Sequence, residues 1–208
     1  VTVTWTSVGI QTVRIIYNDA NGCSPAAPTV YPFLVKPIPS PNITGPQSVC
    51  INSTGNIYST DTAMLNYTWS ISSGGRINSG NGTNNITVTW DSPGAQSISV
   101  YYTNPDGITS TTTNYIVTVN PLPQPSITGP IGSCAGSTRN IYSTEKEKTT
   151  YFWTVSEGGT ITSGEGSSDI SVTWNTIGTQ TVEVVYTDAN GCTGSSAPLG
   201  VLVRLAPE

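Results

Sequence analysis

Cysteines are the residues of this chain best suited to covalent chemistry. The chain has four, at positions 23, 50, 134 and 192, and no two form a Cys-x-x-Cys pair. It has no histidine, which excludes Ser-His-Asp and Cys-His catalytic arrangements and every zinc site with a histidine ligand. We therefore expect disulfide chemistry, with no catalytic centre, no metal site and no cofactor.

Carboxylates are the second group that could do chemistry. Glu157, Glu165 and Asp169 lie in one predicted loop region, where a carboxylate pair would be required for glycoside hydrolysis. We favour a solvated acidic face over an active site, because the equivalent residues of the preceding repeat are uncharged. A hydrolase is thus the weakest of the functions that we consider.

The composition restricts the partners of this chain. Only 9% of its 208 residues are charged, with 7 Lys+Arg and a formal net charge of −5. Nucleic-acid binding and polybasic membrane contacts both need clustered cations, so we expect neither. No apolar run approaches the length that crosses a bilayer, so we expect no membrane insertion.

An internal repeat organises the whole sequence. Residues 39–50 return at 123–134, an offset of 134 − 50 = 84, and residues 86–103 return at 170–187 with the same offset. The first 23 residues are a further copy of the segment at 86–103 and 170–187 and of the turn that follows it. We predict the C-terminal half of a repeat at 1–38 and complete repeats at 39–122 and 123–208, all taken from a longer array.

The apolar pattern within a repeat has a period of two, which predicts strands. Gly, Asn, Pro and Ser turns separate about seven such segments, a pattern typical of an antiparallel β-sandwich. Residues 1–36 would contribute only the last three strands, and we expect further chain or another copy to cover their open face. In the first complete repeat the predicted strands are 42–45, 56–60, 66–72, 75–80, 85–90, 97–103 and 114–120.

Alternation also assigns the aromatic and apolar side chains to faces. All five Trp residues are in register with inward-facing neighbours, so we predict core positions for them. Ile16, Tyr101 and Val185 occupy equivalent outward positions. They are candidates for a lateral contact between molecules, although a covering loop is the reading that we prefer.

Two proline-rich linkers connect the repeats. They read KPIPSP at 36–41 and NPLPQP at 120–125. Alternating prolines favour a semi-rigid polyproline II segment, so we predict a stiff rod with limited swivel between modules.

Two motifs recur in the repeats. One is W-x-[IV]-x-x-G-G at 69–75 and 153–159, and the other is G-x-Q-x-[IV]-x-V-x-Y before the Asn-Gly-Cys turn. In these motifs the repeat resembles the PKD-like domain. More narrowly, the tandem resembles the PKD-like repeats of large Bacteroidota cell-surface proteins, including gliding-motility adhesins exported by the type IX system. The acidic DFGDG motif of the standard family is absent, which removes the acidic turn site that the family would imply.

The resemblance implies an extracellular or cell-surface location. It implies a non-catalytic stalk of an adhesin or filament, with neighbouring repeats and possible other copies in a fibre as partners. The alternative is an accessory spacer or carbohydrate-binding module of a secreted enzyme, for which glycan binding is not indicated by the residues. Asp-Thr-Ala at 61–63 resembles a Bacteroidota O-glycosylation sequon, which makes Thr62 a candidate acceptor.

An extracellular chain suggests disulfides, and the repeat suggests their partners. We predict a bond between Cys134 and Cys192, which lie 192 − 134 = 58 residues apart in one repeat. Cys50 would be an unpaired, buried thiol, because its equivalent partner position holds Ile108. The partner of Cys23 would lie upstream of residue 1, and a Cys23–Cys50 bond is the rival pairing.

Overall fold

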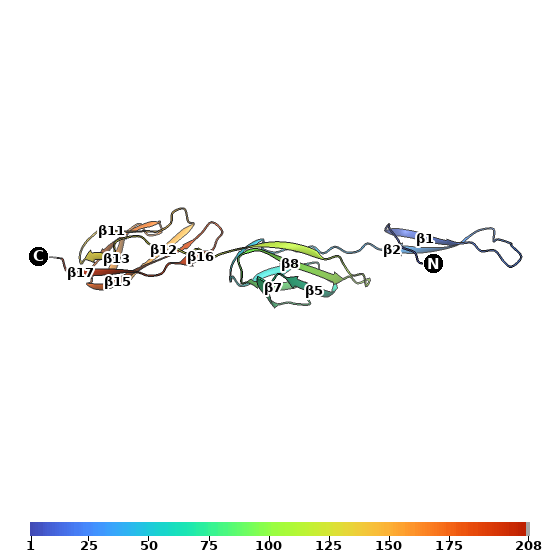
Figure 1. The fold of residues 1–208 in the computed structure, drawn as a ribbon, viewed down its shortest axis with the longest axis horizontal. Coiled ribbons are helices and arrows are strands. Elements are labelled where there is room, and N and C mark those ends of the chain that lie inside the picture. The colour runs from blue at the N-terminus through green and yellow to red at the C-terminus, as the bar shows by residue number, and fades with distance from the viewer. Residues whose placement is uncertain (207–208) are drawn as a thin grey trace.

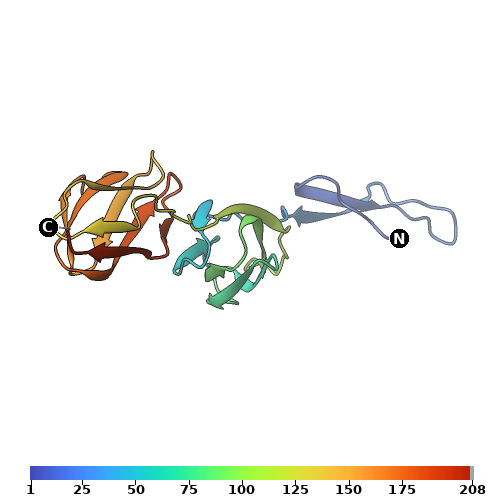
Figure 2. The same cartoon turned by 60° about the vertical axis from the view of Figure 1, so that its left-hand side comes forward.

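The computed structural model describes residues 1–206, in which strands are the only regular elements and no helix could cross a membrane. Three units lie end to end along the longest axis, from a hairpin at the N-terminus to the last repeat at the C-terminus (Figure 1). The view turned by 60° shows the same elongated arrangement (Figure 2). The expected fold class, all-β sandwich repeats joined by proline-rich linkers, is confirmed.

The first complete repeat contains two sheets. One has four strands in the order β3-β9-β8-β5, and the other has three in the order β4-β7-β6. All neighbours are antiparallel except β3 and β9, which run parallel. The strands are β3 (Ser48–Cys50), β4 (Asn56–Ser59), β5 (Leu65–Ile71), β6 (Gly75–Ser79), β7 (Asn85–Trp90), β8 (Gly94–Thr103) and β9 (Thr113–Asn120).

The last repeat has the same plan with one additional short strand, β16, beside β15. Its sheets follow the orders β10-β17-β15-β12 and β11-β14-β13. The final two residues of the repeat that we place at 123–208 lie outside the described part. The strands are β10 (Gly132–Cys134), β11 (Asn140–Ser143), β12 (Thr150–Val155), β13 (Gly159–Ser163), β14 (Asp169–Trp174), β15 (Gly178–Thr187), β16 (Thr193–Ser195) and β17 (Leu199–Arg204).

One predicted strand is replaced by another nearby. Residues 42–45 form only an isolated bridge between Thr44 and Ser59, and the chain becomes a strand three residues later, in β3. The bridge cannot extend because Pro46 has no N–H to donate and Gly45 is pressed against Tyr58. β3 pairs with the last residues of β9, and Cys50 lies opposite Asn120 at that end of the sandwich.

A tryptophan at the end of β7 or β14 lies at the centre of each core. Trp90 and Trp174 are fully buried, and each indole N–H donates to a buried tyrosine hydroxyl. A Cβ added at Gly75 would lie 2.4 Å from Trp90, which explains why the W-x-[IV]-x-x-G-G motif needs its second glycine. The motif therefore encodes packing between the two sheets.

The N-terminal unit is a two-stranded hairpin of β1 (Gly9–Ile15) and β2 (Thr29–Val35). The predicted third strand of this unit, at residues 1–6, is absent. The equivalent strands β7 and β14 each lie between two partner strands, and this unit has no counterpart of those partners. Trp5 is therefore not a core residue. It is half-buried beside Phe33, whereas the other four tryptophans are buried.

Candidate functional site at the junction of the two complete repeats

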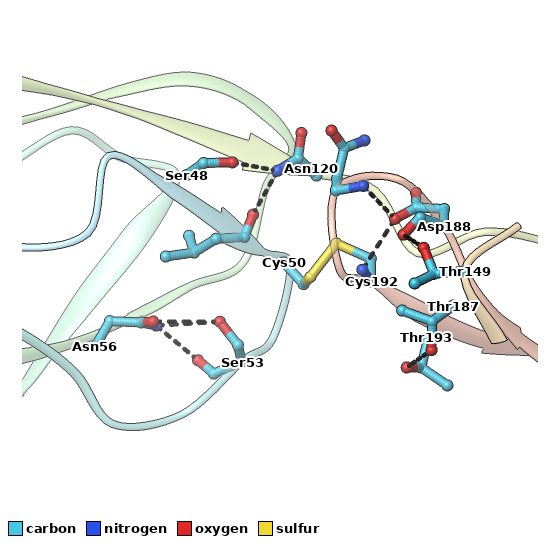
Figure 3. The surroundings of a disulfide bond; sticks show 12 residues. Ser48, Cys50, Ser53, Asn56, Asn120, Thr149, Thr187, Asp188, Cys192 and Thr193 are labelled. Atoms are coloured by element: carbon cyan, nitrogen blue, oxygen red, sulfur yellow. Dashed lines mark hydrogen bonds between the residues drawn. A yellow bond between two sulfur atoms is a disulfide. The ribbon is translucent and has the colours of Figure 1, made fainter.

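A disulfide between Cys50 and Cys192 joins the two complete repeats (Figure 3). Cys50 ends β3 of the first repeat, and Cys192 closes the turn after β15 of the second. Their Cα atoms are 5.6 Å apart, and Cys192 is fully buried. The bond adds a covalent crosslink to the proline-rich linker between the two repeats, so it is the strongest candidate for a functional feature of this chain.

The predicted Cys134–Cys192 pairing is wrong, as is the prediction of an unpaired Cys50. We call the end of a repeat that receives the preceding linker its leading pole, and the other end its trailing pole. Cys134 is paired with Arg204 at the trailing pole, whereas Cys192 follows the end of β15 at the leading pole. The ten residues of β15 separate these poles. At about 3.4 Å per residue the separation is roughly 30 Å, far beyond the reach of about 7 Å for a disulfide.

The turn that carries Cys192 is held by one carboxylate. Asp188 Oδ1 accepts the backbone N–H groups of Asn190 and Cys192, both at 2.9 Å. The backbone of Asp188 closes the turn by donating to the Cys192 carbonyl at 2.9 Å and by accepting from Gly191 at 3.1 Å. The cysteine is thus presented at the tip of a closed loop whose shape does not depend on the disulfide.

The trailing pole of the first repeat is equally well fixed. Asn120 donates its side-chain amide to Ser48 Oγ at 2.8 Å and to the Val49 carbonyl at 3.2 Å. Asn56 donates to Ser53 on the other side of Cys50 (Figure 3). It also donates to the Val88 carbonyl at 3.1 Å. Both sulfur atoms are therefore carried by backbone that is hydrogen-bonded on each side of them.

The linker packs directly on the second repeat. A Cβ added at Gly194 would lie 1.9 Å from the carbonyl oxygen of Pro123, so only glycine allows this approach. An open hollow beside the contact is lined by linker residues and by β15 and β16. Val185 belongs to this lining and is half-buried.

An acidic side chain anchors the far end of each linker. In the last repeat the Glu145 carboxylate accepts the backbone N–H of Ser126 at 3.2 Å and its hydroxyl at 2.5 Å. Burial opposes ionisation of this carboxyl, but the hydrogen bonds from Ser126 and Thr144 prevail and lower its pKa to about 2. The anchor is therefore an ionised carboxylate over the whole physiological range.

The equivalent acid of the first complete repeat is Asp61, since 145 − 61 = 84. It accepts the Asn42 backbone N–H at 3.1 Å and the Tyr102 hydroxyl at 2.8 Å. Burial, followed by this hydrogen bond, raises the pKa of Tyr102 to about 12. The same linker anchor is thus built twice with different acids.

The junction between the hairpin and the first complete repeat lacks a disulfide. Its turn has Ile108 where the other junction has Cys192, and Asn104 takes the role of Asp188 by accepting the Ile108 N–H at 2.8 Å. An ion pair between Lys36 and Asp106 spans this junction instead. Exposed ion pairs contribute about 0–1 kcal/mol, so this is the weaker of the two joints.

The remaining sequence candidates do not converge on a site. Ile16 is exposed, Tyr101 is 40% exposed and Val185 is half-buried, so the three equivalent positions differ in accessibility. Thr62 is exposed in the bend after β4, where glycosylation stays a prediction. The lateral contact likewise stays a prediction.

The three loop carboxylates differ in their surroundings. Both oxygens of Asp169 accept serine hydroxyls, from Ser143 and Ser168 at 2.6 Å each, and these bonds lower its pKa. Glu157 and Glu165 are exposed. Within residues 1–206, no three His, Cys, Asp or Glu side chains are grouped to hold a metal ion.

Sequence reasoning missed the role of Cys50, although a signal for it was present. Pairing within a repeat leaves Cys50 without a partner, because position 108 is isoleucine. Pairing the first cysteine of one repeat with the turn cysteine of the next uses both Cys50 and Cys192. The poles on which these residues lie decide between the two schemes.

Comparisons with known proteins identify the module. A family model described as PKD-like domain matches residues 36–117 and 120–201. No curated protein matches the chain at the sequence level. The D00-D0 domain of intimin is 14% identical, with 78% of this chain and 98% of that chain covered and a TM-score of 0.37.

Other solved structures resemble the chain at a similar distance. The fibronectin(III)-like modules of Clostridium thermocellum CbhA are 11% identical, with 79% and 94% of the two chains covered and a TM-score of 0.39. The Yersinia pseudotuberculosis adhesin InvE is 14% identical, with 78% and 59% covered and a TM-score of 0.28. These likenesses are too distant to carry a statement about function.

Proposed function

Because this chain belongs to the PKD-like domain family, we propose that it is a non-catalytic, tension-carrying stalk segment of a large bacterial cell-surface adhesin or filament. PKD-like modules are typically structural. The stalk would hold a binding region away from the cell, and its own residues would supply length, stiffness and resistance to pulling.

The position of the Cys50–Cys192 disulfide is the observation that carries this proposal. The two cysteines are 142 residues apart in sequence, although they are neighbours in space. A force applied to the two ends of the chain passes along residues 1–50, crosses the disulfide and leaves through the segment after Cys192. Most of both complete repeats lies outside this path, so tension cannot pull it out while the bond is intact.

The disulfide also supports an extracellular location. Disulfides persist in oxidising compartments and are rare in the cytosol of most organisms. The low Lys and Arg content of the chain fits a surface exposed to many other molecules without binding nucleic acid. The finer assignment to a Bacteroidota gliding-motility adhesin exported by the type IX system is part of our proposal and is supported by the motif resemblance alone.

Single-molecule stretching of the chain, tethered at its two ends, tests the proposal. In oxidising buffer we expect the 142-residue loop to stay closed at forces that unfold β-sandwich modules. Reduction should release additional contour length of roughly 500 Å, because an extended residue spans about 3.3–3.6 Å.

The Cys192→Ser variant is the matched control, since it should show the reduced behaviour under all conditions. Equal contour lengths for the oxidised wild type and this variant would reject the role in carrying tension. A folded structure that hydrolyses or binds glycans with high affinity would reject the non-catalytic stalk in favour of another function.

The geometry does not favour the alternative of a carbohydrate-binding module. Such a module needs exposed aromatic rings arranged as a platform. Tyr31 and Phe33 are exposed neighbours, but their ring planes meet at 61°, an edge-on arrangement. A glycan array would separate the two functions, with no binding expected for a stalk.

A further inference from the structure

The two free cysteines of this chain lie at positions equivalent to those of the bonded pair, Cys50 and Cys192. Cys134 is the equivalent of Cys50, since 134 − 50 = 84, and Cys23 is the equivalent of Cys192. We propose that the trailing pole around Cys134 is a docking site for the Asp-Ala-Asn-Gly-Cys turn at residues 19–23 of a second copy, with a Cys134–Cys23 disulfide linking the copies head to tail. The inference goes beyond the proposed function and does not depend on tension.

The backbone around Cys134 repeats that around Cys50 bond for bond. Ala135 N–H donates to the Arg204 carbonyl at 2.8 Å, as Ile51 donates to Asn120 at 2.8 Å. The Gly136 N–H donates to the Trp174 carbonyl at 2.8 Å, as the Asn52 N–H donates to the Trp90 carbonyl at 2.8 Å. The backbone that holds the bonded cysteine in one repeat is therefore already formed around the free cysteine in the other.

The asparagine amide beside the cysteine is also reproduced. Asn140 donates to the Val172 carbonyl at 2.9 Å and to the Ser137 carbonyl at 3.2 Å. Asn56 makes the same two bonds beside Cys50, at 3.1 Å and 3.0 Å. The thiol of Cys134 is thus held in a preformed position and remains half-exposed.

The turn at residues 19–23 is the same shape as the turn that docks in the known junction. Asp19 Oδ1 accepts the N–H of Asn21 at 2.9 Å and of Cys23 at 2.8 Å, and Asp19 N–H donates to the Cys23 carbonyl at 2.9 Å. The corresponding distances around Asp188 are all 2.9 Å. The five residues are identical in sequence, and Cys23 is exposed.

The docking surface around Cys134 is more apolar than its counterpart in the preceding repeat. Ile131, Leu202 and Leu205 are exposed and line a hollow of about 630 Å³ next to Cys134. The equivalent residues beside the occupied Cys50 are Gln47, Thr118 and Pro121. An apolar rim beside a free cysteine favours burial against a second surface.

Within residues 1–206 the turn cannot come from the same molecule, so a second copy supplies it. The connection between β1 and β2 carries Cys23, and β10 of the last repeat ends at Cys134. The hairpin and the last repeat lie at opposite ends of the molecule, with a complete repeat between them (Figure 1). Head-to-tail contacts of this kind use two different surfaces, and in an elongated molecule with those surfaces at opposite ends we expect them to generate linear filaments. Repetition of the Cys50–Cys192 joint would then continue from one molecule to the next.

The chemistry requires a two-electron oxidant. A small-molecule disulfide such as oxidised glutathione can serve: its S–S bond breaks, the two cysteine thiols are oxidised, and their two protons pass to the released glutathione thiolates. The products are one Cys134–Cys23 disulfide and two molecules of reduced glutathione. The Cys50–Cys192 bond takes no part.

The test uses Cys23→Ser and Cys134→Ser variants of the full chain in a glutathione redox buffer. The first variant keeps only the docking cysteine free and the second keeps only the turn cysteine free. We expect an equimolar mixture to yield about tenfold more covalent dimer than either variant alone. A small difference in binding free energy between the head-to-tail contact and the symmetric contacts is enough for this ratio. Peptide mapping should identify Cys134 joined to Cys23, and the wild type should form a ladder of oligomers.

Substitution at Asp19 separates specific docking from random collision of thiols. In the Cys134→Ser background, Asp19→Ala should open the turn and reduce dimer formation, whereas Asp19→Asn should retain it, because Asn104 closes the corresponding turn of the middle repeat. Three results would each overturn the proposal. They are a yield of Cys23–Cys23 or Cys134–Cys134 dimer equal to that of the mixed dimer, a dimer yield that Asp19→Ala does not change, and no dimer in the mixture.

Discussion

Gly194 lies directly against Pro123, so close that a Cβ on the glycine would be 1.9 Å from the proline carbonyl oxygen. Gly194 is the central residue of β16, and Pro123 belongs to the linker that arrives at the same pole. The linker is therefore packed on the repeat that follows it, next to the Cys50–Cys192 disulfide. Three features, a covalent bond, a glycine contact and an acidic anchor, hold one junction.

Gly194→Ala should displace the linker and destabilise the last repeat by about 1–3 kcal/mol, the usual range for overpacking a closed contact. Gly200→Ala is the matched control, because no atom lies within 4 Å of the position where its Cβ would be. Thermal unfolding measures the effect, and spin-label distances between the two repeats report the displacement. Equal behaviour of the two variants would show that the Gly194 contact is not tight in solution.

Trp153→Ala should reduce the free energy of unfolding of the last repeat by about 3–5 kcal/mol, because it empties a buried indole site. Trp153 is 3% exposed, and its indole N–H donates to the Ser167 carbonyl at 2.8 Å. Hydrogen exchange should show lost protection at 123–206 and retained protection at 39–120, since repeats couple mainly through their interfaces. Simultaneous loss in both repeats would contradict this.

Acid should weaken the anchor between the linker and the last repeat. The pKa of Glu145 falls from its ordinary value of 4.5 to about 2 in the folded chain. Its stabilising contribution is therefore fully present above about pH 4.5 and is lost as the pH falls through 2. Urea unfolding at pH 5 and at pH 2.5 should show a smaller decline for Glu145→Gln than for the wild type, and equal declines would assign the acid sensitivity to other groups.

Removal of residues 1–35 should leave the two complete repeats almost unchanged in stability. The ion pair between Lys36 and Asp106 is retained, and we expect a shift in Tm below about 4 °C, which corresponds to less than about 1 kcal/mol for a domain of this size. The truncation should also reduce self-association, because the hairpin exposes Ile10, Tyr31 and Leu34. A larger loss of stability would mean that the hairpin packs on its neighbour in solution.

Much of the fold follows from local patterns in the sequence. Alternation in 85–90 and 114–120 correctly assigns β7 and β9, and the inward positions of Val88 and Val117 are fully buried. The region around 42–50 was harder to predict, because a proline and a closely packed glycine end one bridge and begin a different strand. The effect of the glycine depends on its contact with Tyr58 on another strand.

The candidate site depended on information that is not local. The repeat period of 84 residues correctly aligned Cys50 with Cys134, and the turn motif aligned Cys23 with Cys192. These equivalences, the absence of histidine and the glycines of the W-x-[IV]-x-x-G-G motif were all readable in the sequence. The pairing of the cysteines could not be predicted from the sequence, because spacing along the chain does not show at which pole of a repeat each cysteine lies.

The sequence by itself determined an all-β chain of PKD-like repeats, its module period, its proline-rich linkers and the identity of its reactive residues. Local propensity and hydrophobic alternation specify such features, since each depends on neighbours a few residues away. Only the tertiary structure decided that Cys192 bonds to Cys50 in the neighbouring repeat. The parallel pairing of β3 with β9 carries the first cysteine to the trailing pole, and β15 carries the turn cysteine to the leading pole, so the two thiols that meet belong to successive modules.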